Sequence, residues 1–518
     1  MIYQTSISKK YSLLVLLSAI FLWLSYHPAN QGWLIWIALV PWLVYIRMEI
    51  NTRRLMFFSW LSGFIFFLVG LWWLHFVTLP GLIIVSFILG LYFLLFAWLS
   101  KMILRRFGDN AYYLSIPLLW VFLEMARAYV ATGFPWFLLG HTQYQWQTLI
   151  QITDITGVYG ISFLIAAVNS YLVFIIDRLV IHRIPRRQTR PQVVLCGLII
   201  LGFGLGILIY GYFRIKSLQF ELGPKIGIVQ GNIEQRLKLN RNRGSEIYEK
   251  HRALSLQLTA EKPDLIVWAE TMFPYLVKAE SESLEYMKET VQECQTDMII
   301  GAVSDDSVLP DEFKLYNSAY FISARGELLG RYDKIHLVPV SEALPLRETF
   351  PWLEKVVLRL SELKRLPTLN PGTNLSLFQW HDYKFGILIC YESIFPDMNR
   401  VIVREGAQFI INISNDGWFR NGAELEQILA ISVFRAVENK IGFIRATNTG
   451  ISAFISPLGE MNILKDSNGC YKEIAGTLTD KVTIGRGMTF YNRWGDYFPV
   501  ICLLGLCCII ISKILKLT

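Results

Sequence analysis

The chain has 518 residues, of which 53% are hydrophobic and only 17% are charged, a composition that excludes an ordinary soluble protein and indicates membrane spans. Its formal net charge of +8 raises the question of a nucleic-acid partner. The basic residues cluster beside apolar runs instead of forming a basic domain, so we expect no nucleic acid to bind. The length predicts more than one domain.

Seven apolar segments occupy the first 213 residues, and an eighth closes the chain. Several reach the length of about 20 residues that crosses the hydrocarbon of a bilayer. We expect these spans at residues 11–27, 31–46, 56–76, 81–104, 112–130, 158–181, 192–213 and 497–515. The first span follows Lys9 and Lys10 and is interpreted as a retained anchor, because no small-residue cleavage site comes after it.

Basic residues cluster at alternate ends of these segments. The clusters contain Lys9 and Lys10; Arg47, Arg53 and Arg54; Lys101, Arg105 and Arg106; Arg178, Arg183, Arg186, Arg187 and Arg190; and Lys513 and Lys516. With eight spans all of them lie on one side, which the positive-inside rule makes the cytoplasm. We therefore predict a membrane domain with seven helices at 1–213, an external domain at 214–496, and an eighth helix with a cytoplasmic tail at 497–518.

The external segment has the pattern of an α/β domain, with short apolar runs typical of buried strands and longer amphipathic stretches typical of helices. Strands are expected at 225–230, 265–268, 298–303, 316–323, 384–389, 409–413, 443–447 and 452–455. Helices are expected at 246–261, 281–294, 396–405 and 424–439. This mixture predicts sheets covered by helices.

Three of the expected sheet segments carry chemically useful residues. Leu-Ile-Val-Trp-Ala leads to Glu270, Gly-Arg-Tyr-Asp leads to Lys334, and Phe-Gly-Ile-Leu-Ile leads to Cys390. A buried strand that stops at such a residue places it at the rim of a sheet, where α/β enzymes build their sites. A thiolate is a strong nucleophile, an ammonium stabilises it and an oxyanion, and a carboxylate moves the proton. The set suits acyl transfer, although each residue alone also fits packing, capping or a surface charge.

These three motifs resemble the nitrilase superfamily, whose members use a Glu–Lys–Cys triad on an αββα sandwich. Further motifs resemble the membrane branch of that superfamily, the apolipoprotein N-acyltransferases. They are Thr-Gly-Phe-Pro-Trp at 132–136, Val-Gln-Gly-Asn-Ile at 229–233, His-Leu-Val-Pro at 336–339, Asn-Ile-Ser-Asn-Asp-Gly-Trp-Phe at 412–419 and Thr-Phe-Tyr-Asn-Arg-Trp-Gly-Asp at 489–496. The resemblance runs in order from the early spans to the last one.

The resemblance implies a role for each residue of the set. Glu270 would be the general base, Lys334 the stabiliser of thiolate and oxyanion, and Cys390 the acyl-accepting nucleophile. The supporting residues that it implies are Glu342, Tyr391 and Glu392. No metal and no soluble cofactor is implied.

The resemblance also implies the substrates. The acyl donor would be a phospholipid, preferably phosphatidylethanolamine, and the acceptor would be the N-terminal α-amine of diacylglyceryl-cysteine on an apolipoprotein. The transfer would proceed through a cysteine thioester and complete lipoprotein maturation. The location would be the bacterial inner membrane, in contact with its lipids, with the catalytic domain on the periplasmic side.

The sequence departs from the family pattern at Leu239, Ala343 and Ile428, which leaves substrate preference open. Two other functions also remain open. A membrane-tethered nitrilase-type amidohydrolase would pass the acyl group to water, and a divergent acyltransferase would use another acceptor. A non-catalytic scaffold is disfavoured because it has no reason to keep all three chemical types.

Four further features have alternative interpretations. Glu124 and Arg127, three residues apart in one span, are expected to pair with each other or to contact substrate. The aromatic loop at 134–136 is an interfacial anchor or part of a lipid entrance. The segment 341–372 is a lid that gates lipid entry or an ordinary packed helix. His336 is a less favoured partner for Cys390 than Lys334.

The cysteines allow one disulfide hypothesis. Cys294 and Cys470 lie in the polar part of the chain together with Cys390, so a bond between the first two is open. The remaining four cysteines lie in apolar runs, where cysteine packs as a small hydrophobe.

Overall fold

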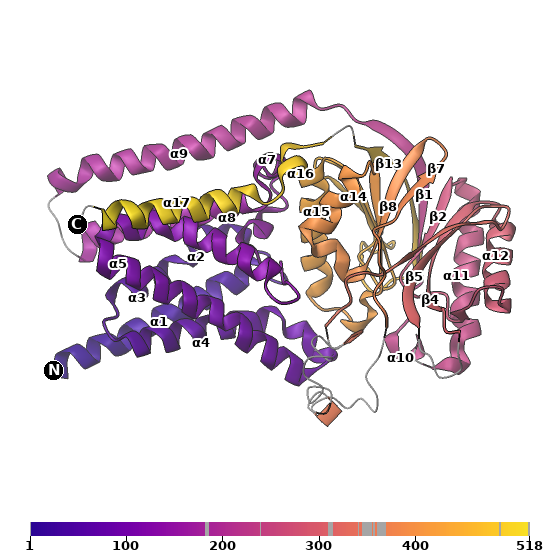
Figure 1. Cartoon of the computed structure of the whole chain (residues 1–518), viewed down its shortest axis with the longest axis horizontal. Coiled ribbons are helices and arrows are strands. Elements are labelled where there is room, and N and C mark those ends of the chain that lie inside the picture. Colours follow the sequence, from indigo (N-terminus) through magenta and orange to yellow (C-terminus); the bar gives the residue numbers. More distant parts are fainter. Residues whose placement is uncertain are drawn as a thin grey trace. The chain divides into compact units, whose positions relative to one another are not determined.

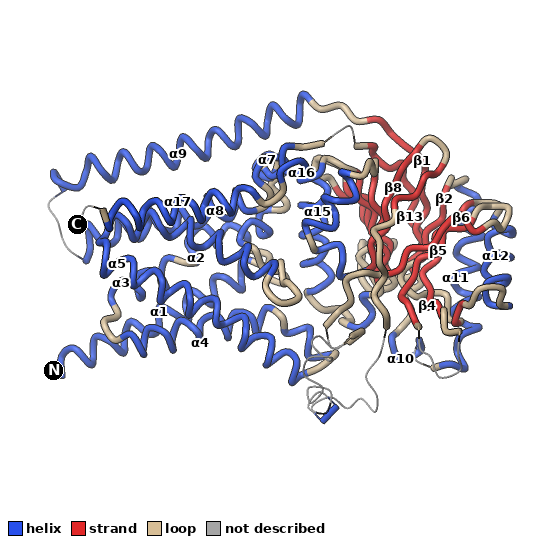
Figure 2. Tube along the Cα trace, viewed as in Figure 1, coloured by secondary structure: helices blue, strands red, loops and turns tan. Residues whose placement is uncertain are grey.

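The computed structural model describes residues 2–181, 186–238, 240–308, 314–339, 341–343, 355, 358–359, 369–485 and 488–515. These residues form two compact units. The first contains Met1–Leu218 and Trp494–Thr518, and the second contains Gln219–Arg493. Figure 1 traces the chain through both units, and Figure 2 shows helices in the first unit and the strands in the second.

The first unit is built from apolar helices (Figure 1). They are α1 (Ile2–Ser25), α2 (Ile35–Ala38), α3 (Val40–Met48), α4 (Thr52–Gly70), α5 (Leu79–Tyr129), α6 (Gln147–Ile150), α7 (Thr153–Thr156), α8 (Tyr159–Ile176), α9 (Arg186–Ser217) and α17 (Tyr497–Ile514). Within the described ranges, four helical stretches are long and apolar enough to cross a membrane, namely Thr52–Gly70, Leu79–Tyr129, Tyr159–Leu179 and Pro191–Ser217. The eight-span arrangement stays a prediction.

Helix α5 contains two of the expected spans, 81–104 and 112–130. Its 51 residues would make a straight rod of about 77 Å, more than twice the hydrocarbon thickness of a bilayer. The helix is broken at Gly108, whose φ of 80° lies in the left-handed region that glycine adopts without strain. The break divides α5 into two parts, each of which alone has a length suited to one crossing.

The expected span at 31–46 is not one helix. The structure divides Gly32–Met48 into a 3₁₀ turn followed by α2 and α3. Pro41 lies at the start of α3, where its missing N–H and fixed φ are tolerated, whereas the interior of a long helix would not accept it.

Glu124 and Arg127 do not form the direct ion pair that was the favoured interpretation. Glu124 Oε1 accepts hydrogen bonds from Trp120 Nε1 and from the backbone N–H of Leu139, both at 2.8 Å. Arg127 Nη2 donates to the carbonyl oxygen of Phe137 at 3.1 Å. The two charges are held apart because each binds a different point of the loop that follows α5.

The aromatic loop after α5 does not present its tryptophan to the surroundings. Trp136 is buried, with its ring 5.5 Å from that of Trp73 and stacked on Phe134 at 6.0 Å. An interfacial anchor needs an accessible ring. Trp136 instead packs this loop onto the helical unit.

The second unit contains two mixed sheets. Their strands are β1 (Glu221–Gln230), β2 (Leu265–Trp268), β3 (Leu276–Val277), β4 (Asp297–Asp305), β5 (Leu315–Ile322), β6 (Leu328–Asp333), β7 (Leu377–Trp380), β8 (Tyr383–Ile389), β9 (Phe409–Ser414), β10 (Gly442–Thr447), β11 (Ala453–Ile455), β12 (Met461–Ile463) and β13 (Gly476–Ile484). The first sheet has the order β13-β1-β2-β4-β5-β6, with β3 beside β4, and the second has the order β12-β11-β10-β9-β8-β7. Parallel pairing joins β1, β2 and β4, and likewise β8, β9 and β10.

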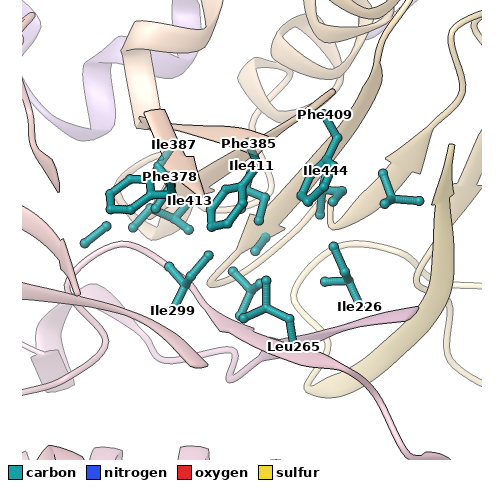
Figure 3. Close-up of a cluster of buried hydrophobic side chains, with 14 of the residues drawn as sticks. Ile226, Leu265, Ile299, Phe378, Phe385, Ile387, Phe409, Ile411, Ile413 and Ile444 are labelled. Carbon is teal, nitrogen blue, oxygen red and sulfur yellow. The ribbon is translucent and has the colours of Figure 1, made fainter. Parts of the chain in front are cut away.

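The two sheets pack face to face around an apolar core. Alternate residues of a strand point to opposite faces, so Leu265 and Val267 of β2 enter this core while Ile266 and Trp268 point the other way. Figure 3 shows the facing rows, with Ile226, Leu265 and Ile299 on one side and Phe385, Phe409, Ile411 and Ile444 on the other.

Helices cover the outer face of each sheet. Helices α11 (Gly244–Leu258) and α12 (Glu282–Cys294) pack on the first sheet, where Ile247 and Met287 join the outward residues of β2 and β4. Helices α14 (Pro396–Arg404) and α15 (Glu424–Asn439) pack on the second sheet. The layers are therefore αββα, and the expected fold class of apolar membrane helices plus a nitrilase-like sandwich is confirmed.

The strands and helices expected in this unit are confirmed, with ends that differ by a few residues. The sequence missed several strands, among them β7 and β13. Strand β13 has the sequence Gly-Thr-Leu-Thr-Asp-Lys-Val-Thr-Ile and pairs antiparallel with β1 at the edge of the first sheet. Its polar residues break the apolar pattern that would have indicated a strand. Strand β13 is the longest strand that was not expected, and as an edge strand it does not need apolar residues on its solvent-facing side.

The disulfide hypothesis is wrong, because Cys294 and Cys470 are both free thiols. Cys294 packs in the apolar core beneath α12, whereas Cys470 lies exposed in a turn. A buried side chain facing one sheet cannot meet a thiol on a surface turn without displacing its neighbours.

Gly301 of β4 allows the close approach that positions Glu270. A Cβ at this position would lie 2.4 Å from the carbonyl oxygen of Ala269 and 2.9 Å from the Cα of Glu270. We expect Gly301→Ala to displace Glu270 and to slow alkylation of the Cys390 thiol by about tenfold or more, since a shift of about 1 Å has such effects. Alkylation is measured by mass spectrometry of the Cys390 peptide.

Gly244→Ala is the matched control. Its added Cβ would meet Tyr275 at an ordinary 3.4 Å, so labelling and melting temperature should stay unchanged. Unaltered labelling of Cys390 in the Gly301→Ala protein would contradict the positioning role of this glycine.

Candidate active site

The three candidate catalytic residues lie at the ends of strands. Glu270 comes two residues after β2, Lys334 directly follows β6, and Cys390 directly follows β8. Strand β6 runs antiparallel to β5, which runs antiparallel to β4, and β4 is parallel to β2. The ends of β2 and β6 therefore reach the same edge of the first sheet.

Lys334 is held between two carboxylates. Its Nζ lies 3.3 Å from Glu270 Oε1 and 2.9 Å from Glu342 Oε1, and the lysine side chain is only 1% exposed. Burial alone would lower the pKa of Lys334, but the negative charges of Glu270 and Glu342 outweigh burial and raise it. Lys334 is therefore a fixed cation throughout the physiological pH range.

The Glu270 carboxylate is oriented by three donors, one of which is Lys334. Asn317 Nδ2 donates to Oε1 at 2.6 Å, and the backbone N–H of Asn415 donates to Oε2 at 2.8 Å. Burial favours the neutral acid, yet the charges of Lys334 and Lys238 and these hydrogen bonds bring the pKa of Glu270 below its ordinary value. The carboxylate is ionised at neutral pH and can accept a proton.

Cys390 occupies a sharp turn between β8 and a 3₁₀ segment. Its φ of 53° lies in the left-handed region, a conformation that costs a non-glycine residue about 1 kcal/mol or more. The thiol is partly buried, and burial together with the charge of Glu270 raises the pKa of Cys390 well above its ordinary value, although Lys334 opposes this. The resting thiol is therefore protonated beside an ionised carboxylate.

Glu392 ties the cysteine turn to the lysine strand. Its Oε1 accepts from the backbone N–H groups of Ile335 and His336, at 2.7 and 3.0 Å, and its Oε2 accepts from that of Ile389 at 2.7 Å. The Tyr332 hydroxyl lies 2.9 Å from both oxygens. Burial raises the pKa of Glu392 to about 7 despite these donors. This carboxyl group joins the two sheets at the site.

Tyr391 and His336 form an aromatic wall beside the cysteine. The His336 ring lies 4.0 Å from Phe395 and 5.8 Å from Tyr391, and Tyr391 meets Phe395 edge to face at 5.0 Å. His336 therefore packs against the aromatic residues that follow β8 of the second sheet.

The motif at 412–419 supports the cysteine turn from the neighbouring strand. Asn412 Nδ2 donates to the carbonyl oxygen of Cys390 at 3.3 Å, and Arg445 binds Asn412 and pairs with Asp416 at 2.7 Å. Both members of the Arg445–Asp416 pair are fully buried. A buried pair of this kind fixes local geometry, because removing either partner leaves an uncompensated charge.

Lys238 is a site residue that the sequence did not single out. Its Nζ donates to the Glu270 carbonyl oxygen at 3.4 Å and to the Thr271 hydroxyl. Burial lowers the pKa of Lys238 to about 8, and the charge of Lys334 acts in the same direction, against the pull of Glu270 and Cys390. The position of this lysine in Gln-Arg-Leu-Lys, a few residues after Gln-Gly-Asn-Ile, is the sequence feature that could have indicated its role.

Asn317 was also missed. It is a single amide within the otherwise apolar Leu-Tyr-Asn-Ser-Ala-Tyr-Phe-Ile of β5, and it donates to both Glu270 and Glu342. A polar residue that interrupts a buried strand could have drawn attention to it. Among the described residues, no cluster of His, Cys, Asp and Glu could hold a metal ion.

Of the other features predicted near the site, most of the segment 341–372, together with Leu239, lies outside the described residues. The hypothesis that segment 341–372 is a lid stays a prediction. Ala343 closes the short bridge with Pro339, and Ile428 is buried in α15.

Comparison with known proteins places this chain in a family. The model for the apolipoprotein N-acyltransferase N-terminal domain matches residues 18–171, and the carbon-nitrogen hydrolase model matches residues 225–468. An apolipoprotein N-acyltransferase from Geobacter metallireducens is 33% identical over 513 residues, covering 96% of this chain and 94% of that protein. The chain belongs to the apolipoprotein N-acyltransferase family.

A second curated relative supports the same assignment. The apolipoprotein N-acyltransferase from Chlorobaculum tepidum is 27% identical, covering 91% of this chain and 90% of that protein. Among solved structures, an amidase of the nitrilase superfamily from Nesterenkonia has a TM-score of 0.38 and 15% identity, covering 53% of this chain and 96% of the amidase. As a member of the family, the chain is an acyltransferase with a nitrilase-like domain, and it is a membrane protein.

The pKa of Lys238 predicts a pH-dependent contribution to thiol reactivity. A lysine whose pKa is lowered to about 8 is charged below that pH and loses its charge above it. At pH 7, Lys238→Met should slow alkylation of Cys390 by about tenfold, which corresponds to a change of about one unit in the pKa of the thiol. The gap between this variant and the unmodified protein should close as the pH rises through 8.

Lys238→Arg separates charge from structure. Because its guanidinium stays charged, this variant should label Cys390 faster than the unmodified protein at pH 9.5. A difference between Lys238→Met and the unmodified protein that is constant from pH 6 to 10 would contradict the electrostatic role.

Proposed function

We propose that this protein transfers one fatty acyl chain from a phospholipid, preferably phosphatidylethanolamine, to the N-terminal α-amine of diacylglyceryl-cysteine on apolipoproteins. Family membership gives the coarser part of this function, the N-acylation of lipoproteins at a membrane. The contact that carries the chemistry is the ion pair of Lys334 with Glu270 beside the Cys390 turn.

The first step forms a thioester. Glu270 takes the proton of the Cys390 thiol as the sulfur attacks the ester carbonyl carbon of the donor lipid. Lys334 stabilises the negative charge that develops on the carbonyl oxygen, since its ammonium is buried and permanently charged. The C–O bond breaks, the proton on Glu270 passes to the departing oxygen, and a lysophospholipid leaves.

The second step forms the amide. The neutral α-amine of the acceptor attacks the thioester carbon, and Glu270 takes a proton from the attacking nitrogen. Collapse of the tetrahedral intermediate breaks the C–S bond, and the proton returns to sulfur. Because donor and acceptor use one nucleophile in turn, the kinetics should be ping-pong.

Glu342, Glu392 and Tyr391 are proposed as supporting residues. Glu342 contacts Lys334 directly, which supports a role in holding the ammonium. Glu392 and Tyr391 flank the cysteine turn, where the first fixes the backbone and the second narrows the space beside the thiol.

The location is proposed from the charge pattern. By the positive-inside rule, the basic clusters next to the apolar segments would lie in the cytoplasm, and residues 214–496 would then lie on the periplasmic side of the bacterial inner membrane. A lipid donor in the outer leaflet and an exported lipoprotein meet on that side.

A covalent intermediate tests the proposed chemistry. Incubation of the purified protein with phosphatidylethanolamine and no acceptor should add one acyl group to Cys390, detected by mass spectrometry and released by hydroxylamine. Cys390→Ala should abolish both adduct and turnover. Lys334→Met should slow adduct formation by about 100- to 1000-fold, as removal of an oxyanion donor does.

A diacylated lipopeptide then distinguishes the acceptors. Addition of this peptide should discharge the adduct and yield the N-acyl peptide, whereas an amidohydrolase would release free fatty acid at the same rate without it. Robust transfer by Cys390→Ala, or an acyl group on another residue, would overturn the assignment.

Cys470 offers a natural probe of the topology. This thiol is free and exposed in the catalytic unit. If that unit is periplasmic, a membrane-impermeant maleimide added to intact spheroplasts that carry the Cys390→Ala variant should label Cys470, and Cys470→Ser in the same background should remove the signal. Labelling that requires lysis of the spheroplasts would reverse the proposed orientation.

A further inference from the structure

Glu270 receives one of its hydrogen bonds from a loop that is itself held by a second loop. The donor is the backbone N–H of Asn415, which directly follows β9 and lies 2.8 Å from Glu270 Oε2. Asn448 directly follows β10, the parallel neighbour of β9, and its Nδ2 donates to Asn415 Oδ1 at 2.9 Å. The side chain of Asn448 therefore helps to decide where the Asn415 N–H points.

The same amide binds the segment that follows β1. Asn448 Oδ1 accepts from the Ile233 N–H at 2.8 Å, and Nδ2 donates to the Ile233 carbonyl oxygen at 2.8 Å. The backbone carbonyl of Asn448 accepts from the N–H of Asn232 at 2.8 Å. Asn448 is fully buried, so these contacts replace hydrogen bonds that water cannot supply. One side chain thus joins the segment after β1 to the ends of two strands of the second sheet.

This segment leads back to Glu270. It continues into the short helix α10 (Gln235–Lys238), where Gln235 Oε1 accepts from Asn415 Nδ2 at 3.1 Å. At the end of α10, Lys238 Nζ donates to the Glu270 carbonyl oxygen at 3.4 Å. The contacts close a ring that runs from the Glu270 carboxylate through Asn415, Gln235 and Lys238 to the Glu270 backbone.

The ring encloses a strained backbone position. Thr271, directly after Glu270, has a φ of 52°. The left-handed region is a genuine outlier for a β-branched residue, and such a conformation persists only when its surroundings hold it. Lys238 holds it by donating to the Thr271 hydroxyl. The direction in which Glu270 leaves its strand therefore depends on contacts from outside that strand.

We propose that Asn448 is a positioning residue for the general base, because it holds Asn415 and the loop 232–238 and so sets the hydrogen bond to the Glu270 carboxylate. Gln235 is a second positioning residue, which closes the ring at α10. Both amides act through Asn415 and not by contact with substrate. The inference rests on the proposed function only for the role of Glu270 as the base that deprotonates Cys390.

The ionisation of Glu270 reports on this hydrogen bond. Burial raises the pKa of Glu270, whereas the charges of Lys334 and Lys238 and two hydrogen bonds, one of them from the Asn415 N–H, lower it. Further titratable groups that face Glu270 are Cys390, Asp416 and, next to Lys334, Glu342. A neutral substitution of Asn448 leaves all these charges in place, so a raised pKa of Glu270 would reflect the weakened hydrogen bond.

The test measures the rate at which iodoacetamide alkylates Cys390 in the full-length protein between pH 4 and 7.5, by mass spectrometry of the Cys390 peptide. Glu270 accepts the thiol proton only when it is ionised, so its pKa sets the acid limb of the profile. Asn448→Ala should move this limb up by about one pH unit, which makes labelling about tenfold slower at acidic pH. An acid limb that does not move would overturn the proposal.

Gln235→Met is a milder change that tests the same ring. Gln235 is partly exposed, and its loss leaves the contacts of Asn448 in place, so the variant should fold with an unchanged melting temperature. The acid limb should move in the same direction by about half a unit, with labelling about threefold slower at acidic pH. If Asn448→Ala does not fold, an unchanged limb in Gln235→Met overturns the proposal.

Asn439→Ala is the matched control. Asn439 is an equally buried amide at the end of α15, where its Nδ2 donates to the Arg435 carbonyl oxygen at 2.9 Å and its Oδ1 accepts from Asn492 at 2.8 Å. Its loss should lower the melting temperature as Asn448→Ala does but leave the acid limb in place. An equal shift in both variants would mean that general loosening moves the limb, and it would sink the positioning role.

Glu270→Gln separates the inference from the proposed function. This variant removes the base, so its profile should lose the acid limb. An acid limb that survives in Glu270→Gln would reject Glu270 as the base and with it the proposed chemistry. A limb that disappears in Glu270→Gln but stays fixed in Asn448→Ala would reject the positioning role alone.

Discussion

The buried ammonium of Lys334 is the constraint around which the catalytic unit is organised. A charge removed from water is tolerated only when partners surround it, and breaking a buried pair costs about 3–5 kcal/mol. Glu270 and Glu342 supply these partners from different parts of the chain, and Asn317 binds both carboxylates. The ion pairs and hydrogen bonds that surround the Lys334 ammonium thus fix the positions of several loops.

The same arrangement sets the protonation states that acyl transfer requires. Glu270 is ionised because cations and N–H donors outweigh its burial, whereas the thiol of Cys390 stays protonated because it is buried beside that carboxylate. The proton then moves only when a substrate carbonyl accepts the sulfur. Lys238, which loses its charge near pH 8, adds an adjustable contribution to a site whose main cation is permanent.

Buried polar groups also link structural elements elsewhere in the chain. Glu392 binds the backbone on both sides of the sandwich, and Arg445 joins Asp416 to the strand beneath the cysteine turn. In the helical unit, Glu124 and Arg127 bind the loop after α5. In each case the geometry of a loop depends on a charge that water cannot reach.

The sequence alone determined the class of the protein. Apolar runs of about 20 residues predicted the membrane helices, and alternating and continuous apolar patterns predicted most strands. Glu270, Lys334 and Cys390 stood out because each follows a segment expected to be a strand. These features are local, since hydrophobic periodicity and strand ends can be read from neighbouring residues. Motif resemblance then added Glu342, Tyr391 and Glu392.

Only the tertiary structure decided which distant groups meet. Lys238 and Asn317 reach Glu270 across 32 and 47 residues of sequence, and no local pattern records such contacts. The separation of Glu124 from Arg127 was equally invisible, because helical spacing favours a direct pair and the loop that competes for both charges lies outside the helix. The free Cys294 and Cys470 have the same origin, because packing over long distances chooses among arrangements that the local sequence allows.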